Sequence, residues 1–122
     1  MGLTDLLGRK ASDELEPSQV KERQAAGALL IDVREDFEYQ DGHAPGAKLV
    51  PLGKLSQHLP KLPKDREVLF ICRSGNRSGV ATDLARRAGF TKALNVRGGM
   101  LAWARAGLQI QRGKEDGASE AA

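Results

Sequence analysis

Hydrophobic residues along the chain form two patterns: short continuous apolar runs, and longer stretches in which apolar residues recur at helical spacing. The short runs predict buried β-strands over residues 29–33, 48–52, 68–71 and 93–96. An extended segment is expected to begin at residue 13. The longer stretches predict helices between these strands, over residues 17–26, 35–41, 54–62, 79–88 and 100–106.

Glycine and proline positions mark the limits of several of these elements. Pro17 suits the first turn of a helix, and Gly27, Gly89 and Gly107 follow the last residues of three predicted helices. Residues 42–46 are rich in glycine and proline and are expected to form a loop. The connections between elements are therefore short.

Strands and helices alternate along the whole chain, which predicts an α/β fold with a parallel sheet and helices on both of its faces. A length of 122 residues indicates one domain, which we expect to cover residues 13–112. Residues 1–12 are expected to form a short helix or a frayed end. Residues 113–122 contain mainly Gly, Glu, Ser and Ala and are expected to form a disordered tail.

The cysteine and aromatic content excludes several classes of function. Cys72 is the single cysteine, so the chain can form no intramolecular disulfide, no four-cysteine zinc site and no Cys-x-x-Cys redox pair. Aromatic residues make up 4% of the chain, too few for the stacking platforms of RNA-binding proteins. We expect no nucleic-acid partner.

Charge is distributed unevenly along the chain. Residues 1–47 carry 5 basic and 10 acidic side chains, whereas residues 48–113 carry 13 basic and 3 acidic ones. A basic second half can attract nucleic acid, an acidic partner or a small anion. Taken alone, the charge favours the simplest interpretation, a solvated basic face.

The sequence also bears on location. No stretch approaches the roughly 18 apolar residues of a membrane span. Arg9 and Lys10 follow the apolar part of the N-terminus, which is the reverse of the order in a secretory signal. An unpaired cysteine fits a reducing compartment. We expect a cytoplasmic protein without membrane contact, and the sequence leaves its oligomeric state open.

A candidate site begins where the strand over residues 68–71 ends. This strand runs directly into Cys72, and a polar loop precedes the next helix. The helix N-terminus offers free N–H groups, and with two nearby arginines it should lower the pKa of the Cys72 thiol. Gly75 lets the loop curl so that successive N–H groups converge on an anion. The predicted cradle consists of Arg73, Ser74, Gly75, Asn76, Arg77 and Ser78.

Simpler interpretations apply to this and to other polar residues. A small cysteine at a strand end is often only a buried structural residue, but two arginines following Cys72 so closely favour a reactive thiolate. Arg34 and Glu38 are four residues apart with opposite charges, and we expect a structural ion pair between them. Asp32 either lines the cleft or caps the following segment. His43 is expected to bond to the backbone rather than to activate the cysteine.

Four segments, in this order, resemble the sequence signatures of single-domain rhodaneses, a family of sulfurtransferases. They are Asp32-Val33-Arg34-Glu35 with Glu38-Tyr39, Gly42-His43-Ala44-Pro45-Gly46-Ala47, Cys72-Arg73-Ser74-Gly75-Asn76-Arg77-Ser78, and Gly98-Gly99-Met100-Leu101-Ala102-Trp103. Ala44 stands where the family more often has Ile or Val. The resemblance covers about residues 13–110 and implies the family fold, a mostly parallel five-stranded sheet flanked by helices on both faces.

The resemblance also implies a mechanism. The Cys72 thiolate attacks the outer sulfur of thiosulfate or another sulfane donor and becomes a persulfide, and an acceptor such as cyanide, a thiol or a partner protein then removes that sulfur. The loop of residues 73–78 would bind the anionic donor, with Arg77 and the loop N–H groups stabilising the persulfide and the leaving sulfite. Such a reaction needs no metal and no organic cofactor.

Two other functions compete with a free sulfurtransferase. A sulfur carrier or partner-binding module would keep the fold and show little activity on small molecules. A cysteine phosphatase or arsenate reductase would also use a strand, a cysteine, a loop and a helix. Phosphatases place five residues between their Cys and Arg, whereas four residues separate Cys72 from Arg77, and this spacing disfavours phosphoryl chemistry.

Overall fold

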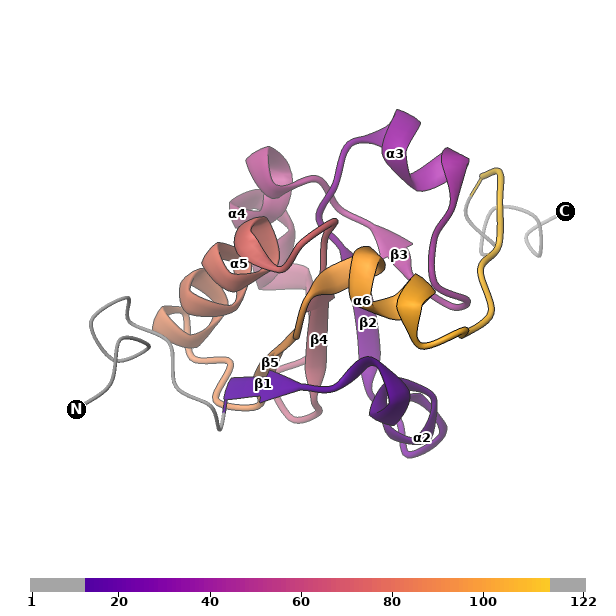
Figure 1. The fold of residues 1–122 in the computed structure, drawn as a ribbon. Coiled ribbons are helices and arrows are strands. Elements are labelled where there is room, and N and C mark those ends of the chain that lie inside the picture. Colours follow the sequence, from indigo (N-terminus) through magenta and orange to yellow (C-terminus); the bar gives the residue numbers. More distant parts are fainter. Residues whose placement is uncertain (1–12, 115–122) are drawn as a thin grey trace, which may run out of the picture.

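Five short strands form a single sheet at the centre of the molecule (Figure 1), in the order β1-β5-β4-β2-β3. Every pairing between neighbouring strands is parallel. The strands are β1 (Glu14–Leu15), β2 (Leu29–Asp32), β3 (Lys48–Leu49), β4 (Val68–Ile71) and β5 (Ala93–Val96). The predicted α/β fold with a parallel sheet is confirmed, and so are the five strands that the resemblance implied.

This computed structural model describes residues 13–114. The predicted N-terminal extension, residues 1–12, and residues 115–122 of the predicted tail lie outside the described residues. Among residues 13–114, no helix has both the length and the apolar character that crossing a membrane would require.

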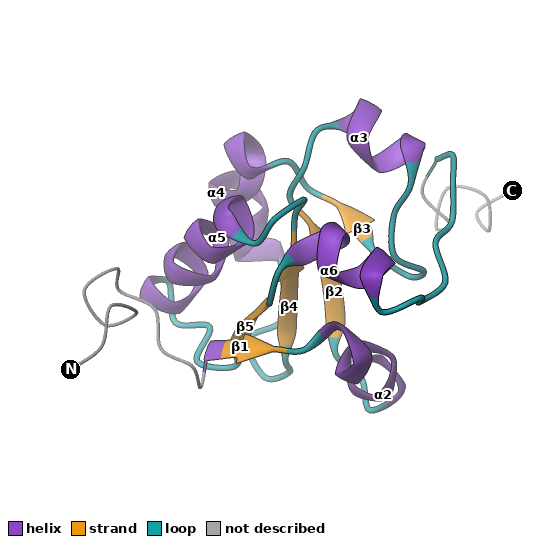
Figure 2. Cartoon of the chain, viewed as in Figure 1, coloured by secondary structure: helices purple, strands orange, loops and turns teal. Residues whose placement is uncertain are grey.

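Helices connect the strands on both sides of the sheet (Figure 2). They are α2 (Val20–Ala25), α3 (Asp36–Asp41), α4 (Leu55–His58), α5 (Asn76–Arg87) and α6 (Gly99–Arg105). Short 3-10 turns precede α2 and flank α4, over Pro17–Gln19, Leu52–Lys54 and Leu59–Lys61. The helix predicted over residues 54–62 is therefore split into three short pieces. Its last piece has Pro60 in its first turn, where a proline is tolerated because that N–H has no helical partner.

Both faces of the sheet are buried, which explains why the strands are continuous apolar runs rather than alternating ones. On one face, strand residues such as Leu69 and Val96 pack with Tyr39 of α3 and Trp103 of α6. On the other face, strand residues pack with α4 and α5, and Cys72 belongs to this second cluster. Figure 1 accordingly has α4 and α5 on one side of the strands and α2 and α6 on the other.

Helix α5 begins earlier than its sequence suggested. Residues 73–78 were expected to be loop, but α5 starts at Asn76, so Arg77 and Ser78 lie in its first turn. Gly75 precedes it with φ +102°, a left-handed conformation that side-chain-bearing residues rarely adopt. The true loop between β4 and α5 is therefore short, and it sets Arg77 and Ser78 at fixed positions on a helix.

Backbone hydrogen bonds from the start of α6 hold this loop in place. The N–H of Met100 donates to the Cys72 carbonyl at 2.8 Å, and the N–H of Leu101 donates to the Arg73 carbonyl at 3.0 Å. Gly99 allows this approach because a Cβ there would overlap the Cys72 carbonyl oxygen and lie 2.7 Å from the Arg73 carbonyl carbon. The last of the four signatures, which begins at Gly98, thus has a structural role: it supports the backbone of the cysteine loop.

The close approach at Gly99 yields a stability prediction. Gly99→Ala is expected to lower the unfolding free energy by about 3 kcal/mol, because backbone strain at positive φ and overpacking each cost roughly 1–3 kcal/mol. Gly107→Ala is the matched control, since Gly107 also has positive φ, +72°, but a Cβ there meets no atom within 4 Å. Urea denaturation of both variants measures the difference. Equal losses would show that the contact with the cysteine loop has no part in the effect.

Candidate active site

Cys72 lies immediately after β4, at the carboxyl edge of the parallel sheet, where ligands bind in folds of this kind. Its side chain is 1% exposed and packs in the cluster that contains Ala81 of α5. The N-terminus of α5 faces the sulfur, as the pattern of strand, cysteine, loop and helix predicted.

Two donors contact the Cys72 sulfur directly. The N–H of Gly75 donates to Sγ at 3.1 Å, and the Ser78 hydroxyl lies 3.2 Å from the same atom. The left-handed turn at Gly75 aims its N–H back at the cysteine, three residues earlier. Of the six predicted cradle residues, Gly75 and Ser78 are buried and contact the sulfur, while Arg73, Ser74 and Asn76 are exposed, although the Ser74 N–H also acts on the thiol.

These contacts set the ionisation of the thiol. Burial alone would raise the pKa of Cys72, but the Ser78 hydroxyl and the N–H groups of Ser78, Gly75 and Ser74 outweigh burial and lower this pKa below its usual value. The predicted direction is confirmed, and so is the part assigned to the helix N-terminus. The two arginines are not among the main causes. Neutral hydrogen-bond donors therefore supply the main stabilisation of the thiolate, and the charge of Arg77 also attracts it.

Contacts with Asn95 of β5 hold Ser78 in place. Its hydroxyl lies 2.6 Å from Oδ1 of Asn95, whose amide nitrogen faces the Gly75 carbonyl at 3.2 Å and a Glu14 carboxylate oxygen at 3.4 Å. Both neighbours of that nitrogen are acceptors, so the amide orientation is fixed with Oδ1 toward Ser78. The hydroxyl has one hydrogen and can serve either Asn95 or the thiolate at one time.

Sequence reasoning missed Asn95. The signal available was a single polar residue within the apolar run of β5, at a position that is 1% exposed. A buried amide in a strand must find partners, and here its partners are the backbone and the hydroxyl that surround the cysteine. Asn95 therefore couples β5 to the active-site loop.

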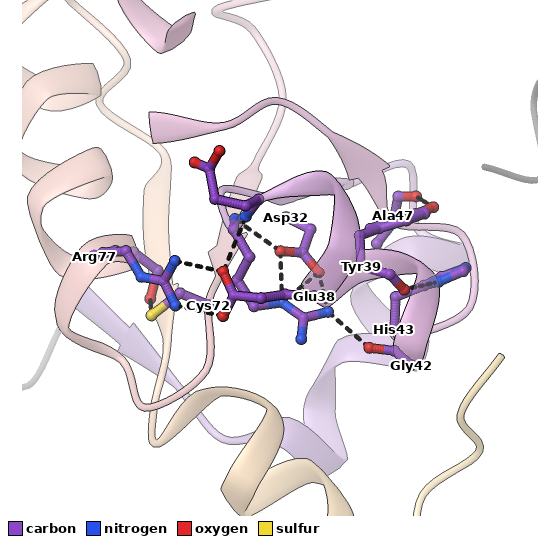
Figure 3. Close-up of polar contacts among 11 residues, drawn as sticks. Asp32, Glu38, Tyr39, Gly42, His43, Ala47, Cys72 and Arg77 are labelled. Carbon is purple, nitrogen blue, oxygen red and sulfur yellow. Dashed lines mark hydrogen bonds and ion pairs between the residues drawn. The ribbon is translucent and has the colours of Figure 1, made fainter. Parts of the chain in front are cut away.

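Arg77 points to a carboxylate from another part of the chain rather than directly to the sulfur (Figure 3). Its Nη1 and Nη2 atoms bind the two oxygens of Glu38 in α3, at 2.8 and 2.9 Å. This bidentate bond is the main cause that lowers the pKa of Glu38 to about 2, and it raises the pKa of Arg77. The pair ties the first turn of α5 to α3 beside Cys72.

The expected ion pair between Arg34 and Glu38 is wrong. Arg34 instead binds the carboxylate of Asp32 through Nε and Nη2, at 2.8 to 3.1 Å, and donates to the Gly42 carbonyl at 2.7 Å. Asp32 is fully buried, so it does not line the cleft, and its carboxylate accepts the Arg34 N–H at 3.0 Å, whereas the cap of α3 is Glu35. Arg34 lies before α3 begins at Asp36, so the spacing rule for two residues of one helix does not hold.

His43 is structural, as expected. Its Nδ1 donates to the Tyr39 carbonyl at 2.8 Å, and its ring stacks on Tyr39 with centroids 3.7 Å apart. Tyr39 in turn donates its hydroxyl hydrogen to the Ala47 carbonyl at 2.6 Å. These contacts fix the loop after α3. The His, Cys, Asp and Glu side chains of residues 13–114 form no group of three or more that could hold a metal ion.

The sequence model of a protein family, described as "Rhodanese-like domain", matches residues 16–106. This chain belongs to the rhodanese-like domain family. A sulfurtransferase from Allochromatium vinosum is 37% identical over 100 residues, which cover 80% of this chain and 94% of that relative. The match supports the four rhodanese signatures found in the sequence.

Solved structures agree with the rhodanese assignment. A rhodanese-related protein from Thermoplasma volcanium superposes with a TM-score of 0.74 at 26% identity, over 80% of this chain and 96% of that one. A thiosulfate sulfurtransferase from Pseudomonas aeruginosa gives a TM-score of 0.76 at 27% identity. The match covers 84% of this chain but 20% of that much longer protein.

The contact from Ser78 to the sulfur predicts the pH dependence of cysteine reactivity. Ser78→Ala should move the midpoint of Cys72 alkylation to higher pH. The rate below the midpoint should fall about threefold to tenfold, because a hydrogen bond to the thiolate is lost. Iodoacetamide labelling against pH, followed by mass spectrometry, measures this midpoint.

Thr82→Val serves as the control for Ser78→Ala. Thr82 is a buried hydroxyl residue one turn further along α5, and its hydroxyl bonds to the Ser78 carbonyl at 2.8 Å rather than to the sulfur. This variant should leave the alkylation midpoint unchanged. An unchanged midpoint in Ser78→Ala would mean that the hydroxyl serves Asn95 alone.

Proposed function

We propose that this rhodanese domain is a sulfurtransferase that moves a sulfane sulfur from thiosulfate or a related donor to a thiophilic acceptor through a Cys72 persulfide. The observation that carries the proposal is the Cys72 sulfur at the N-terminus of α5, with donors from Gly75 and Ser78 and a lowered pKa. Membership of the rhodanese-like family and a relative named as a sulfurtransferase support it.

In the first half-reaction, the Cys72 thiolate attacks the outer sulfur of thiosulfate. A new S–S bond forms to Sγ while the original S–S bond breaks, and its electron pair leaves with sulfite. The anion that departs is doubly charged. Arg73, which is exposed beside the nucleophile, is proposed to attract the donor and to stabilise the leaving sulfite.

In the second half-reaction, an acceptor attacks the outer sulfur of the persulfide. With cyanide, the C–S bond of thiocyanate forms, the persulfide bond breaks, and its electron pair returns to Sγ. The N–H of Gly75 and the Ser78 hydroxyl then stabilise the regenerated thiolate. Because the first product leaves before the acceptor reacts, the kinetics should be ping-pong. A thiol or a partner protein can replace cyanide.

A sulfur-carrier role is the second candidate, and one surface feature favours it. The side chain of Phe37 is 75% exposed, and it lines a cavity of about 420 Å³ together with Arg73 and Leu101. Exposed apolar side chains within a charged cavity beside Arg73 suit a protein acceptor or donor. Faster sulfur transfer to a protein thiol than to cyanide or a small thiol would favour the carrier.

Turnover of a generic aryl phosphate would instead support the phosphatase alternative.

Intact-protein mass spectrometry tests the proposed chemistry. Incubation with thiosulfate should add one sulfur atom per chain, and cyanide should remove it, because Cys72 is the single thiol of the chain. Cys72→Ser should show no addition. Sulfur transfer that persists in Cys72→Ser would eliminate the proposed nucleophile, and wild-type protein that no sulfane donor modifies would exclude the sulfurtransferase itself.

Arg73 yields a separate prediction about salt. Arg73→Ala should lower kcat/KM for thiosulfate about tenfold at low ionic strength, through loss of steering by an exposed charge, and much less at high salt. Steady-state kinetics at two salt concentrations measure the effect. Arg66→Ala is a control, because Arg66 is also exposed but precedes β4, at the opposite edge of the sheet from Cys72. A loss of the same size at both salt concentrations would place Arg73 in direct contact with the donor.

A further inference from the structure

We propose that Glu38 is a positioning residue that sets the class of sulfur donor: by binding the fork of Arg77, it lowers the preference of the site for dianionic donors relative to monoanionic ones. The proposal rests on the proposed function, since it concerns the donor that loads Cys72. It assigns a substrate-selecting role to a residue of α3 that lies far from the cysteine loop in sequence.

The geometry of the pair is the first observation. Arg77 is one of two arginines in the cysteine loop and the first turn of α5, and Figure 3 places it beside the Cys72 sulfur. Both of its terminal nitrogens bind Glu38, at 2.8 and 2.9 Å. A guanidinium presents its donors as a planar fork, and a carboxylate that occupies the fork at both ends competes with an anionic substrate for the same donors.

The placement of Glu38 is the second observation. Its side chain is 17% exposed, and its Oε1 atom also accepts the N–H of Glu35 at 3.0 Å, so it is held from its own helix as well. Because two contacts fix this carboxylate, it can hold the Arg77 side chain for as long as Glu38 is ionised.

The set of charges around the neighbouring cavity is the third observation. The cavity beside the loop is lined by two carboxylates, of Glu38 and Asp41, and by two guanidinium groups, of Arg34 and Arg73. Arg34 is paired with Asp32, and Glu38 is paired with Arg77, so the charge of Arg77 adds little net positive potential for an incoming anion. The interaction energy of a sulfur donor with this potential is proportional to its charge, so the loss of positive potential costs a dianion twice as much as a monoanion.

Two sulfur donors that differ mainly in their charge provide the test of this proposal. Thiosulfate is a dianion, whereas methanethiosulfonate carries the same outer sulfur and a methyl group in place of one charged oxygen. In Glu38→Gln, kcat/KM should rise about tenfold with thiosulfate and about threefold with methanethiosulfonate, because the same change in potential acts on two charges or on one. The glutamine keeps an oxygen for the Glu35 N–H, so the start of α3 is preserved.

Asp41→Asn is the matched control. It removes one negative charge from the same cavity, three residues along the chain from Glu38, while Arg77 remains paired. It should change both kcat/KM values less than Glu38→Gln does and leave their ratio nearly constant. An equal effect in Asp41→Asn would mean that general electrostatics, and not the release of Arg77, explains the result.

The Arg77→Ala variant tests whether the effect of Glu38→Gln depends on Arg77. In Arg77→Ala, Glu38 is left as an unpaired carboxylate near the loop, so thiosulfate should react more slowly than with wild type. Adding Glu38→Gln to Arg77→Ala should restore part of that loss but should not exceed the wild-type rate. A double variant that gains as much as Glu38→Gln alone would overturn the proposal, because the gain would then not depend on a freed guanidinium.

The outcomes separate this inference from the function on which it rests. Persulfide formation in the wild type, followed by mass spectrometry, reports on the sulfurtransferase alone. If the persulfide forms and Glu38→Gln lowers kcat/KM for both donors, Glu38 orients Arg77 for the anion instead of withholding it, and the inference is wrong. If no donor yields a persulfide, the proposed function itself fails.

Discussion

The hydrogen bonds that end at the Cys72 sulfur constrain the surrounding structure. A thiolate that is almost fully buried needs donors close at hand, because burial alone would keep it protonated. The donors are the Gly75 N–H and the Ser78 hydroxyl, and both reach the sulfur only if the chain reverses directly after β4. That reversal needs a left-handed residue at position 75 and a helix that begins at Asn76.

The strands were the most predictable part of the fold, and the physical reason is their burial on both faces. Residues 68–71 and 93–96 match β4 and β5 because a continuous apolar run has few alternatives to a central strand. The start of α5 was less predictable. Asn76, Arg77 and Ser78 have the composition of a loop, yet they form a helical turn whose polar side chains face Glu38 and the sulfur. Contacts with Glu38, which lies far away in the sequence, and with the Cys72 sulfur therefore stabilise this helical turn.

The polar partners of the site were only partly predictable. The cysteine and its loop are contiguous, so the sequence located them. The partner of Glu38 was misassigned to Arg34 because the true partner, Arg77, lies 39 residues away and is brought close only by the β2–α3 and β4–α5 connections. Asn95 contacts Ser78 from a separation of 17 residues, through the pairing of β4 with β5. Such contacts depend on tertiary structure, and no local spacing rule contains them.

The choice of neutral donors at the sulfur has a consequence for the two steps of the proposed reaction. In a persulfide the negative charge lies mainly on the outer sulfur, one bond beyond Sγ. Donors fixed at Sγ therefore stabilise the free thiolate more than they stabilise the persulfide. They make Cys72 a better leaving group when an acceptor takes the outer sulfur, at the expense of some nucleophilicity in the first step. The first step must then draw on charge further out, which the exposed Arg73 supplies, whereas the charge of Arg77 is balanced by Glu38. The inner dipoles and the outer charges thus act on different half-reactions, and a change in one set need not disturb the other.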